Sequence, residues 1–68
     1  MNSPLLKGEI RAHNLTQEEV ATKIGVSLSR FNAKINNTGG AEFSLGEIRA
    51  LKQVLDLSAD KIEAVFFN

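Results

Sequence analysis

The chain has 68 residues, no cysteine, and eight basic residues that balance eight acidic ones. A domain of this size buries only about 60% of the surface that its unfolded chain exposes, and neither disulfides nor Cys-ligated zinc can add stability here. Its 43% of apolar residues is typical of a globular protein. The zero net charge argues mildly against a nucleic-acid-binding protein, which often has a basic surplus.

The charge is divided unevenly along the chain. Residues 1–40 contain five basic and three acidic residues, whereas residues 41–68 contain three basic and five acidic ones. The apolar runs are too short to span a membrane, and the first residues lack the pattern of a signal peptide. We therefore expect one domain, residues 1–68, in the cytoplasm.

Helix signals recur along the chain, and no stretch alternates apolar and polar residues for long. Ser3 before Pro4 predicts the cap and first turn of a helix over about 3–13, which Asn14 should end in the left-handed conformation. The expected inward positions of this helix are Leu6 and Ile10.

Two short helices should follow closely. Thr16 and Glu19 have the spacing of a capping box, in which each side chain bonds the other residue's backbone N–H, and this predicts a helix over about 17–24. Gly25 can adopt a positive φ without strain, and Ser27 should cap a helix over about 28–36. The expected inward positions of the first of these helices are Val20, Ala21 and Ile24. The asparagine- and glycine-rich stretch 36–40 is the clearest loop.

A second capping box begins the fourth predicted helix. It consists of Ser44 and Glu47, and Ser58 should cap a short fifth helix with Asp60 in its first turn. The expected inward positions of the fourth helix are Ile48, Leu51 and Leu55. The apolar positions of the fifth are Ile62, Val65 and Phe66. These patterns predict a compact all-α bundle of about five short helices.

The stretch 16–37 predicts two short helices joined by a glycine-containing turn, a geometry that can present the second helix to a DNA major groove. Residues 16–27 resemble the helix-turn-helix of the phage repressor and Cro family, also called the XRE family. The resemblance rests on a glutamine at the start of the first helix, an alanine at the helix contact and a glycine in the turn, with apolar residues at Val20, Ile24, Val26 and Phe31.

The resemblance extends over essentially the whole chain. Phe31, the pair Ile35 and Asn36, and the pair Phe66 and Phe67 resemble small regulators of Gram-positive phages and prophages. The family implies a five-helix DNA-binding domain of the lambda-repressor type. One departure is Lys34, where the family usually has an apolar residue, and we expect Ile35 to take over its packing role.

A helical wheel sorts the helix over 28–36 into two faces. Phe31 and Ile35 point inward, Ser29 and Ala33 point outward, and Asn32 and Asn36 flank the outward face on the side opposite Arg30. Asparagine can read adenine and arginine can read guanine, and small residues allow close approach to DNA. This face therefore predicts contact with base edges.

The family resemblance adds roles by position. It implies phosphate contacts from Gln17 and Ser27, base contacts from Leu28, Ser29, Asn32 and Ala33, and backbone contacts from the following loop. The full set of candidate DNA-binding residues is Gln17, Ser27, Leu28, Ser29, Arg30, Asn32, Ala33, Lys34, Asn36, Asn37 and Thr38.

Several of these residues have a purely structural alternative. Gln17 is an ordinary first-turn residue, Ser27 is useful as a cap alone, and Leu28 lies near the edge of the core. Arg30 and Lys34 can be solvated or paired with a glutamate.

Phe66 and Phe67 are adjacent, so they cannot both face one core from a helix. A monomer with zero net charge and few basic residues would bind DNA weakly. A two-fold dimer on a pseudo-palindromic operator would double the number of contacts with DNA. We therefore expect a homodimer, formed at least on DNA, with Val65, Phe66 and Phe67 at its interface.

The sequence predicts no enzyme, cofactor or metal site, because it lacks cysteine, has one histidine and contains no phosphate-binding glycine loop. We expect a sequence-specific double-stranded DNA-binding transcription regulator, Cro-like or a small repressor. The alternative is a helical protein-interaction module with the same fold, such as an anti-repressor or an antitoxin partner.

Overall fold

Two of the helices begin at capping boxes. Thr16 Oγ1 accepts a hydrogen bond from the backbone N–H of Glu19 at 3.1 Å, and the Glu19 carboxylate accepts one from the backbone N–H of Thr16 at 2.9 Å. Ser44 and Glu47 make the same reciprocal pair at 3.2 and 2.8 Å. Both predicted capping boxes are therefore confirmed.

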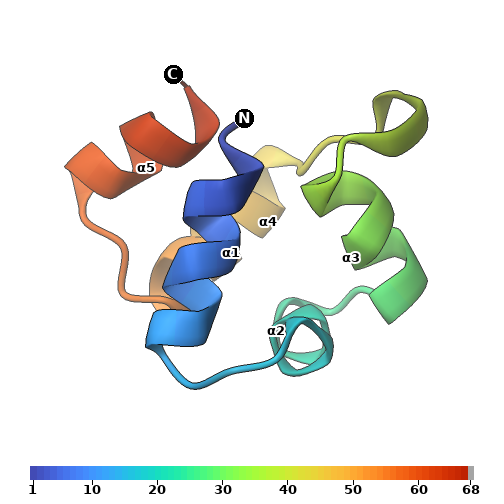
Figure 1. Cartoon of the computed structure of the whole chain (residues 1–68), viewed down its shortest axis with the longest axis horizontal. Helices are drawn as coiled ribbons and strands as arrows, with labels where there is room; N and C mark the ends of the chain where they lie inside the picture. The colour runs from blue at the N-terminus through green and yellow to red at the C-terminus, as the bar shows by residue number, and fades with distance from the viewer. Residues whose placement is uncertain (68) are drawn as a thin grey trace.

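The computed structural model describes residues 1–67, which form five α-helices and one short 3-10 turn, with no strand (Figure 1). The α-helices are α1 (Ser3–Ala12), α2 (Gln17–Ile24), α3 (Leu28–Ile35), α4 (Leu45–Val54) and α5 (Ala59–Phe66), and the 3-10 turn is η1 (Thr38–Gly40). The predicted all-α bundle is thus confirmed. None of these helices is both long and apolar enough to cross a membrane.

The cap of α1 differs from the prediction. Asn2, rather than Ser3, caps the helix, since its Oδ1 accepts a hydrogen bond from the backbone N–H of Leu5 at 3.0 Å. Ser3 is the first helical residue, and its hydroxyl donates to the carbonyl oxygen of Ile35. Asparagine and serine cap helices about equally well. With Asn2 in that place, Ser3 is free to satisfy a carbonyl in the last turn of α3.

The breaks between helices follow from left-handed residues. Asn14 has φ 56° and Gly25 has φ 82°, as the sequence predicts. α3 ends at Ile35 with Asn36 as its C-cap, one residue earlier than expected. The predicted loop after it contains η1, preceded by Asn37 at φ 57°.

The core lies where the five helices meet. Its fully buried residues are Leu6, Ile10, Val20, Ala21, Phe31, Ile35, Leu51, Leu55, Leu57 and Val65. Phe43 packs edge-on against Phe31 and Phe66, with ring centroids 5.5 and 6.1 Å apart. Four predicted apolar positions, Ile24, Ile48, Ile62 and Phe66, are only half-buried because they lie at the margins of the bundle.

Helices α3 and α5 lie on opposite sides of α1 (Figure 1). Asn2 joins α1 to α5, because its backbone N–H donates to the carbonyl oxygen of Val65 at 2.6 Å. Lys61 adds an ion pair with Glu9 at 3.4 Å. The first turn of α1 contacts the last turns of both α3 and α5, and so holds these two helices apart.

Candidate nucleic-acid interface

The tight connection between α2 and α3 depends on Gly25. Its left-handed backbone turns the chain so that the N–H of Val26 donates to the carbonyl oxygen of Ala21 at 3.0 Å. Ser27 follows at once, and its hydroxyl accepts a hydrogen bond from the N–H of Arg30 at 3.2 Å. The two helices pack directly against each other, with their axes crossing steeply (Figure 1).

The face of α3 that points away from the core is polar. Phe31 and Ile35 are completely buried, which fixes the rotation of the helix. Ser29, Arg30 and Asn32 are exposed, and the eight residues of α3 include no acid. Leu28 is 38% exposed and Ala33 is half-buried, so both lie at the edge of this face. The arrangement offers hydrogen-bonding groups and one cation to a partner, with no negative charge opposing them.

Lys34 does not lie free on this face. Its ammonium donates to both carboxylate oxygens of Glu47, at 2.7 and 2.6 Å, and joins α3 to the first turn of α4. Partial burial on its own would raise the pKa of Glu47, but hydrogen bonds from Lys34 and Ser44 and the charge of Lys34 lower the pKa below its ordinary value. The structure thus has the glutamate-paired alternative for Lys34, and Ile35 fills the core beside it.

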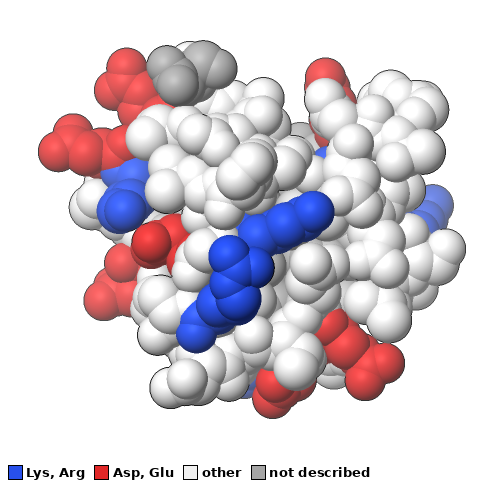
Figure 2. All heavy atoms as spheres, viewed as in Figure 1, with Lys and Arg blue, Asp and Glu red and all other residues white. Residues whose placement is uncertain are grey.

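The end of α3 contacts α1. Asn36 Oδ1 accepts a hydrogen bond from Lys7 Nζ at 2.9 Å, and Asn37 and Thr38 continue the exposed surface into η1. Figure 2 shows a band of basic side chains over α1 that extends toward α3, whereas acidic side chains lie mainly on the side of α5, with others over α2. The basic residues of α1 are Lys7 and Arg11.

Lys7 and Arg11 are not among the candidate DNA-binding residues that the sequence predicts. Their spacing of four residues places them on one face of a helix, and that signal was present in the sequence. What the sequence could not supply was the packing of α1 beside the end of α3. Lys7 places positive charge next to Asn36, and Arg11 adds a second cation one turn further along α1, in a chain whose total charge is zero.

The helix starts near this surface are also polar. Gln17 is the first residue of α2 and is half-buried, while Ser27 is exposed at the start of α3. The carboxylate of Glu19 is engaged in its capping box, but Glu18 beside it is exposed. A bound anion near Gln17 would therefore meet one uncompensated negative charge.

The residues predicted for a dimer interface divide into three cases. Val65 is completely buried in the core of one chain, so its predicted contact with a second chain is wrong for this packing of α5. Phe66 is half-buried and packs against Phe43. Phe67 alone is open to a partner, with 65% of its surface exposed. Inward packing of the last turn of α5 thus leaves Phe67, the residue after the helix, as the one exposed side chain of the three.

No group of three or more His, Asp or Glu residues within residues 1–67 is placed to hold a metal ion. Neither a protein-family model nor a curated protein nor a solved structure matches this chain.

Proposed function

We propose that the chain is a sequence-specific, double-stranded DNA-binding transcription regulator of the Cro or repressor type, which inserts α3 into the major groove. The observation that carries the proposal is the outward face of α3. Ser29, Arg30 and Asn32 are exposed on a helix without acidic residues, whose rotation is fixed by two buried side chains. Small polar and amide side chains beside an arginine are suited to reading base edges.

The surroundings of α3 support the proposal. The first turn of α3, with its exposed Ser27, can bind phosphate through free backbone N–H groups. Lys7 adds positive charge beside Asn36 at the other end of the helix, and Figure 2 shows that the basic band over α1 extends toward α3. With so few cations, we expect a shallow dependence of affinity on salt, and therefore a protein that depends on base contacts and on binding as a pair to a pseudo-palindromic operator.

The test is a gel-shift titration with DNA that flanks its own gene, and with duplexes selected from a random-sequence library. Asn32→Ala and Arg30→Ala should each weaken binding to the selected sequence by about 1–3 kcal/mol. Gln53→Ala removes an exposed amide from α4, away from α3, and is the matched control that should leave affinity unchanged. Circular dichroism of each variant checks that the helices are retained.

Two results would contradict the proposal. One is the absence of saturable binding to any duplex at low salt. The other is an equal loss of affinity in Asn32→Ala and Gln53→Ala, because this would mean that α3 has no special role.

The rival function is a protein-interaction module that uses the same fold. It has little support at α3, where Leu28 is the only large apolar residue on the outward side and is 38% exposed. A more apolar surface lies elsewhere, between α4 and α5.

A further inference from the structure

One side of α1 contacts the C-terminal end of α3. The hydroxyl of Ser3 donates to the carbonyl oxygen of Ile35, and Lys7 Nζ donates to Asn36 Oδ1 at 2.9 Å. Ser3 and Lys7 are four residues apart, so they lie on the same face of the helix, and Arg11 continues that row. α1 therefore places one cation at the C-cap of α3, and a second cation follows one turn later.

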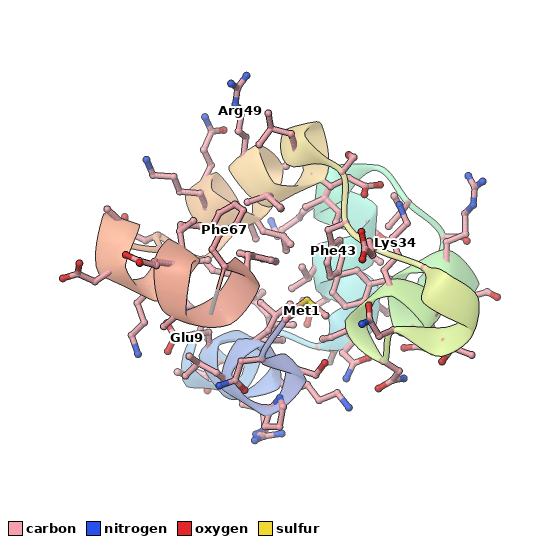
Figure 3. The ribbon with its side chains drawn as sticks, turned by 90° about the horizontal axis from the view of Figure 1, so that it is seen from above. Met1, Glu9, Lys34, Phe43, Arg49 and Phe67 are labelled. Atoms are coloured by element: carbon pink, nitrogen blue, oxygen red, sulfur yellow. The ribbon has the colours of Figure 1, made fainter. Side chains whose placement is uncertain are left out.

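This side of α1 has no acid that offsets its charge. Glu9 is the only acidic residue of α1, and Figure 3 shows it where α1 meets α5. It pairs there with Lys61 at 3.4 Å. Within residues 1–67, no carboxylate lies within 4 Å of the ammonium of Lys7, and the side chain that it contacts, Asn36, is neutral. The charge of Lys7 is therefore available to an anion.

The lysine that belongs to α3 itself is not available in this way. Figure 3 shows Lys34 beside Phe43, and its ammonium donates to both carboxylate oxygens of Glu47 on α4. The charge of Lys34 is thus neutralised within the chain. The cation that α3 can offer to an anion at its C-terminal end comes from α1 instead.

The hydrogen bond between Lys7 and Asn36 determines which groups the two side chains present to a partner. An ammonium has three donors and no acceptor, so the amide oxygen of Asn36 has to face Lys7. The amide nitrogen of Asn36 is then directed away from Lys7 with two N–H donors, and Lys7 keeps two donors of its own. Such a group of donors suits a phosphate oxygen, which only accepts hydrogen bonds.

The same hydrogen bond distinguishes the two asparagines of the α3 surface. An asparagine recognises adenine through one donor and one acceptor at once, and the acceptor of Asn36 is engaged by Lys7 on α1. Asn32 lies one turn earlier and is exposed, and its side chain makes no hydrogen bond within residues 1–67. Asn32 therefore keeps both groups for a base, whereas Asn36 does not.

We propose that Lys7 and Asn36 together clamp one phosphate of the DNA backbone, while Asn32 reads a base. The inference rests on the proposed function and deepens it, because it adds α1 to the interface and gives the two asparagines different roles. In helix-turn-helix complexes the N-terminal residues of the recognition helix contact base edges. The opposite end of α3, where the clamp lies, is then left for the backbone.

The experiment is a fluorescence-anisotropy titration of a selected duplex and of a scrambled duplex, at salt concentrations of about 50–200 mM. Lys7→Met retains most of the apolar stem but removes the charge, and should weaken binding to both duplexes by the same factor. The slope of log affinity against log salt should become shallower by about 0.9 for each bound chain. Lys7→Arg should restore the slope, because it restores a cation.

The asparagine variants separate the phosphate contact from the base contact. Asn36→Ala should weaken both duplexes equally, whereas Asn32→Ala should lower the ratio of the two affinities by at least about fivefold. The double variant of Lys7→Met and Asn36→Ala should lose less than the product of the two single losses, because both side chains bind one phosphate.

Lys61→Met is the matched control for charge. It removes one cation from α5, which lies on the opposite side of α1 from α3, and it should leave the salt slope unchanged (Figure 1). Circular dichroism checks that every variant retains its helices.

Two results overturn the clamp alone. One is a salt slope that changes no more in Lys7→Met than in Lys61→Met. The other is an affinity ratio that falls as far in Asn36→Ala as in Asn32→Ala. In both cases the parent chain still binds the selected duplex, so the proposed function is retained. A parent chain that binds no duplex removes the function and the clamp together.

Discussion

Helices α3 and α5 each have eight residues, and each begins after a serine whose hydroxyl accepts a hydrogen bond at 3.2 Å from the N–H three residues on. Their exposed surfaces nevertheless differ. α3 has a polar outward face without acids, whereas α5 includes Asp60 and Glu63 and ends beside the exposed Phe67. The serine caps determine where both helices begin, but the outward side chains determine what each helix can contact.

The difference is sharpest at matching positions of the first turn. The second helical residue is Ser29 in α3 and Asp60 in α5, and the third is Arg30 and Lys61 respectively. Lys61 is paired with Glu9 at 3.4 Å, while no ion pair within 4 Å involves Arg30 in the described part of the chain. The first turn of α3 is thus the more open of the two to an anionic partner.

The largest expected effect tests how much each helix contributes to the core. Phe31→Ala should lower the free energy of unfolding by about 3–5 kcal/mol, because a completely buried ring leaves a large cavity. Val65→Ala, at the buried position of α5, should cost about 2 kcal/mol. Urea titrations followed by circular dichroism measure both values. Equal losses would mean that α3 is no more central to the core than α5.

The next effect distinguishes the outward faces. Ser29→Glu should weaken DNA binding at least tenfold, or by about 1.4 kcal/mol, because it adds a negative charge to the face of α3. It should not lower stability, since an acid in a first turn interacts favourably with the helix dipole.

Asp60→Ser is the matched change in α5 and should have the opposite pattern. It should lower the free energy of unfolding by about 0.3–1 kcal/mol and leave DNA affinity unchanged. Gel shifts and thermal unfolding of both variants provide the comparison. A loss of DNA affinity in both would argue against a specific role for α3.

The two caps should be equivalent in stability and different in function. Ser27→Ala and Ser58→Ala each remove one capping hydrogen bond and should each cost about 1 kcal/mol in urea titrations. Only Ser27→Ala should also weaken DNA binding, measured at a temperature where both variants are fully folded. An unchanged affinity in Ser27→Ala would limit Ser27 to its capping role.

The smallest effect is pH dependence from the ion pair of Lys34 on α3 with Glu47, which at 2.6 Å is closer than the 3.4 Å pair of Lys61 on α5 with Glu9. The pKa of Glu47 is lower in the folded chain than its ordinary value, so the stabilisation is complete above the unfolded pKa and is lost as pH falls through the folded one. Glu47→Gln retains a capping-box side chain but removes the charge. It should reduce stability at pH 7 by at most about 1 kcal/mol.

The difference between Glu47→Gln and the parent chain should shrink as the pH falls below about 4.5, as measured by urea titrations across that range. Glu19→Gln is the matched control, because it changes the other capping box, where no lysine is paired with the glutamate. A constant difference across the pH range would contradict a role for the ion pair.

Local patterns were enough to predict most of the fold. A capping box or a left-handed glycine depends only on residues within about four positions of each other. The helix boundaries at Thr16, Gly25 and Ser44 could therefore be predicted directly from the sequence. The cap of α1 was assigned wrongly because Asn2 and Ser3 are both good caps. The choice between them depends on the carbonyl of Ile35, which is distant in the sequence.

The candidate site was predictable where it lies on one helix and not where it depends on packing between helices. The wheel of α3 correctly separated Phe31 and Ile35 from the exposed Arg30 and Asn32. The partner of Lys34 lies on α4, and the hydrogen bond of Lys7 to Asn36 joins α1 to α3. No spacing rule within a single helix reveals such contacts.

The hydrogen bond from the backbone N–H of Asn2 to the carbonyl oxygen of Val65 closes a loop that contains nearly all the described residues. Such a closure has a high entropy cost, so it should form late in folding and open early under stress. The Asn2 amide should then exchange its hydrogen faster than those in the middle of α2.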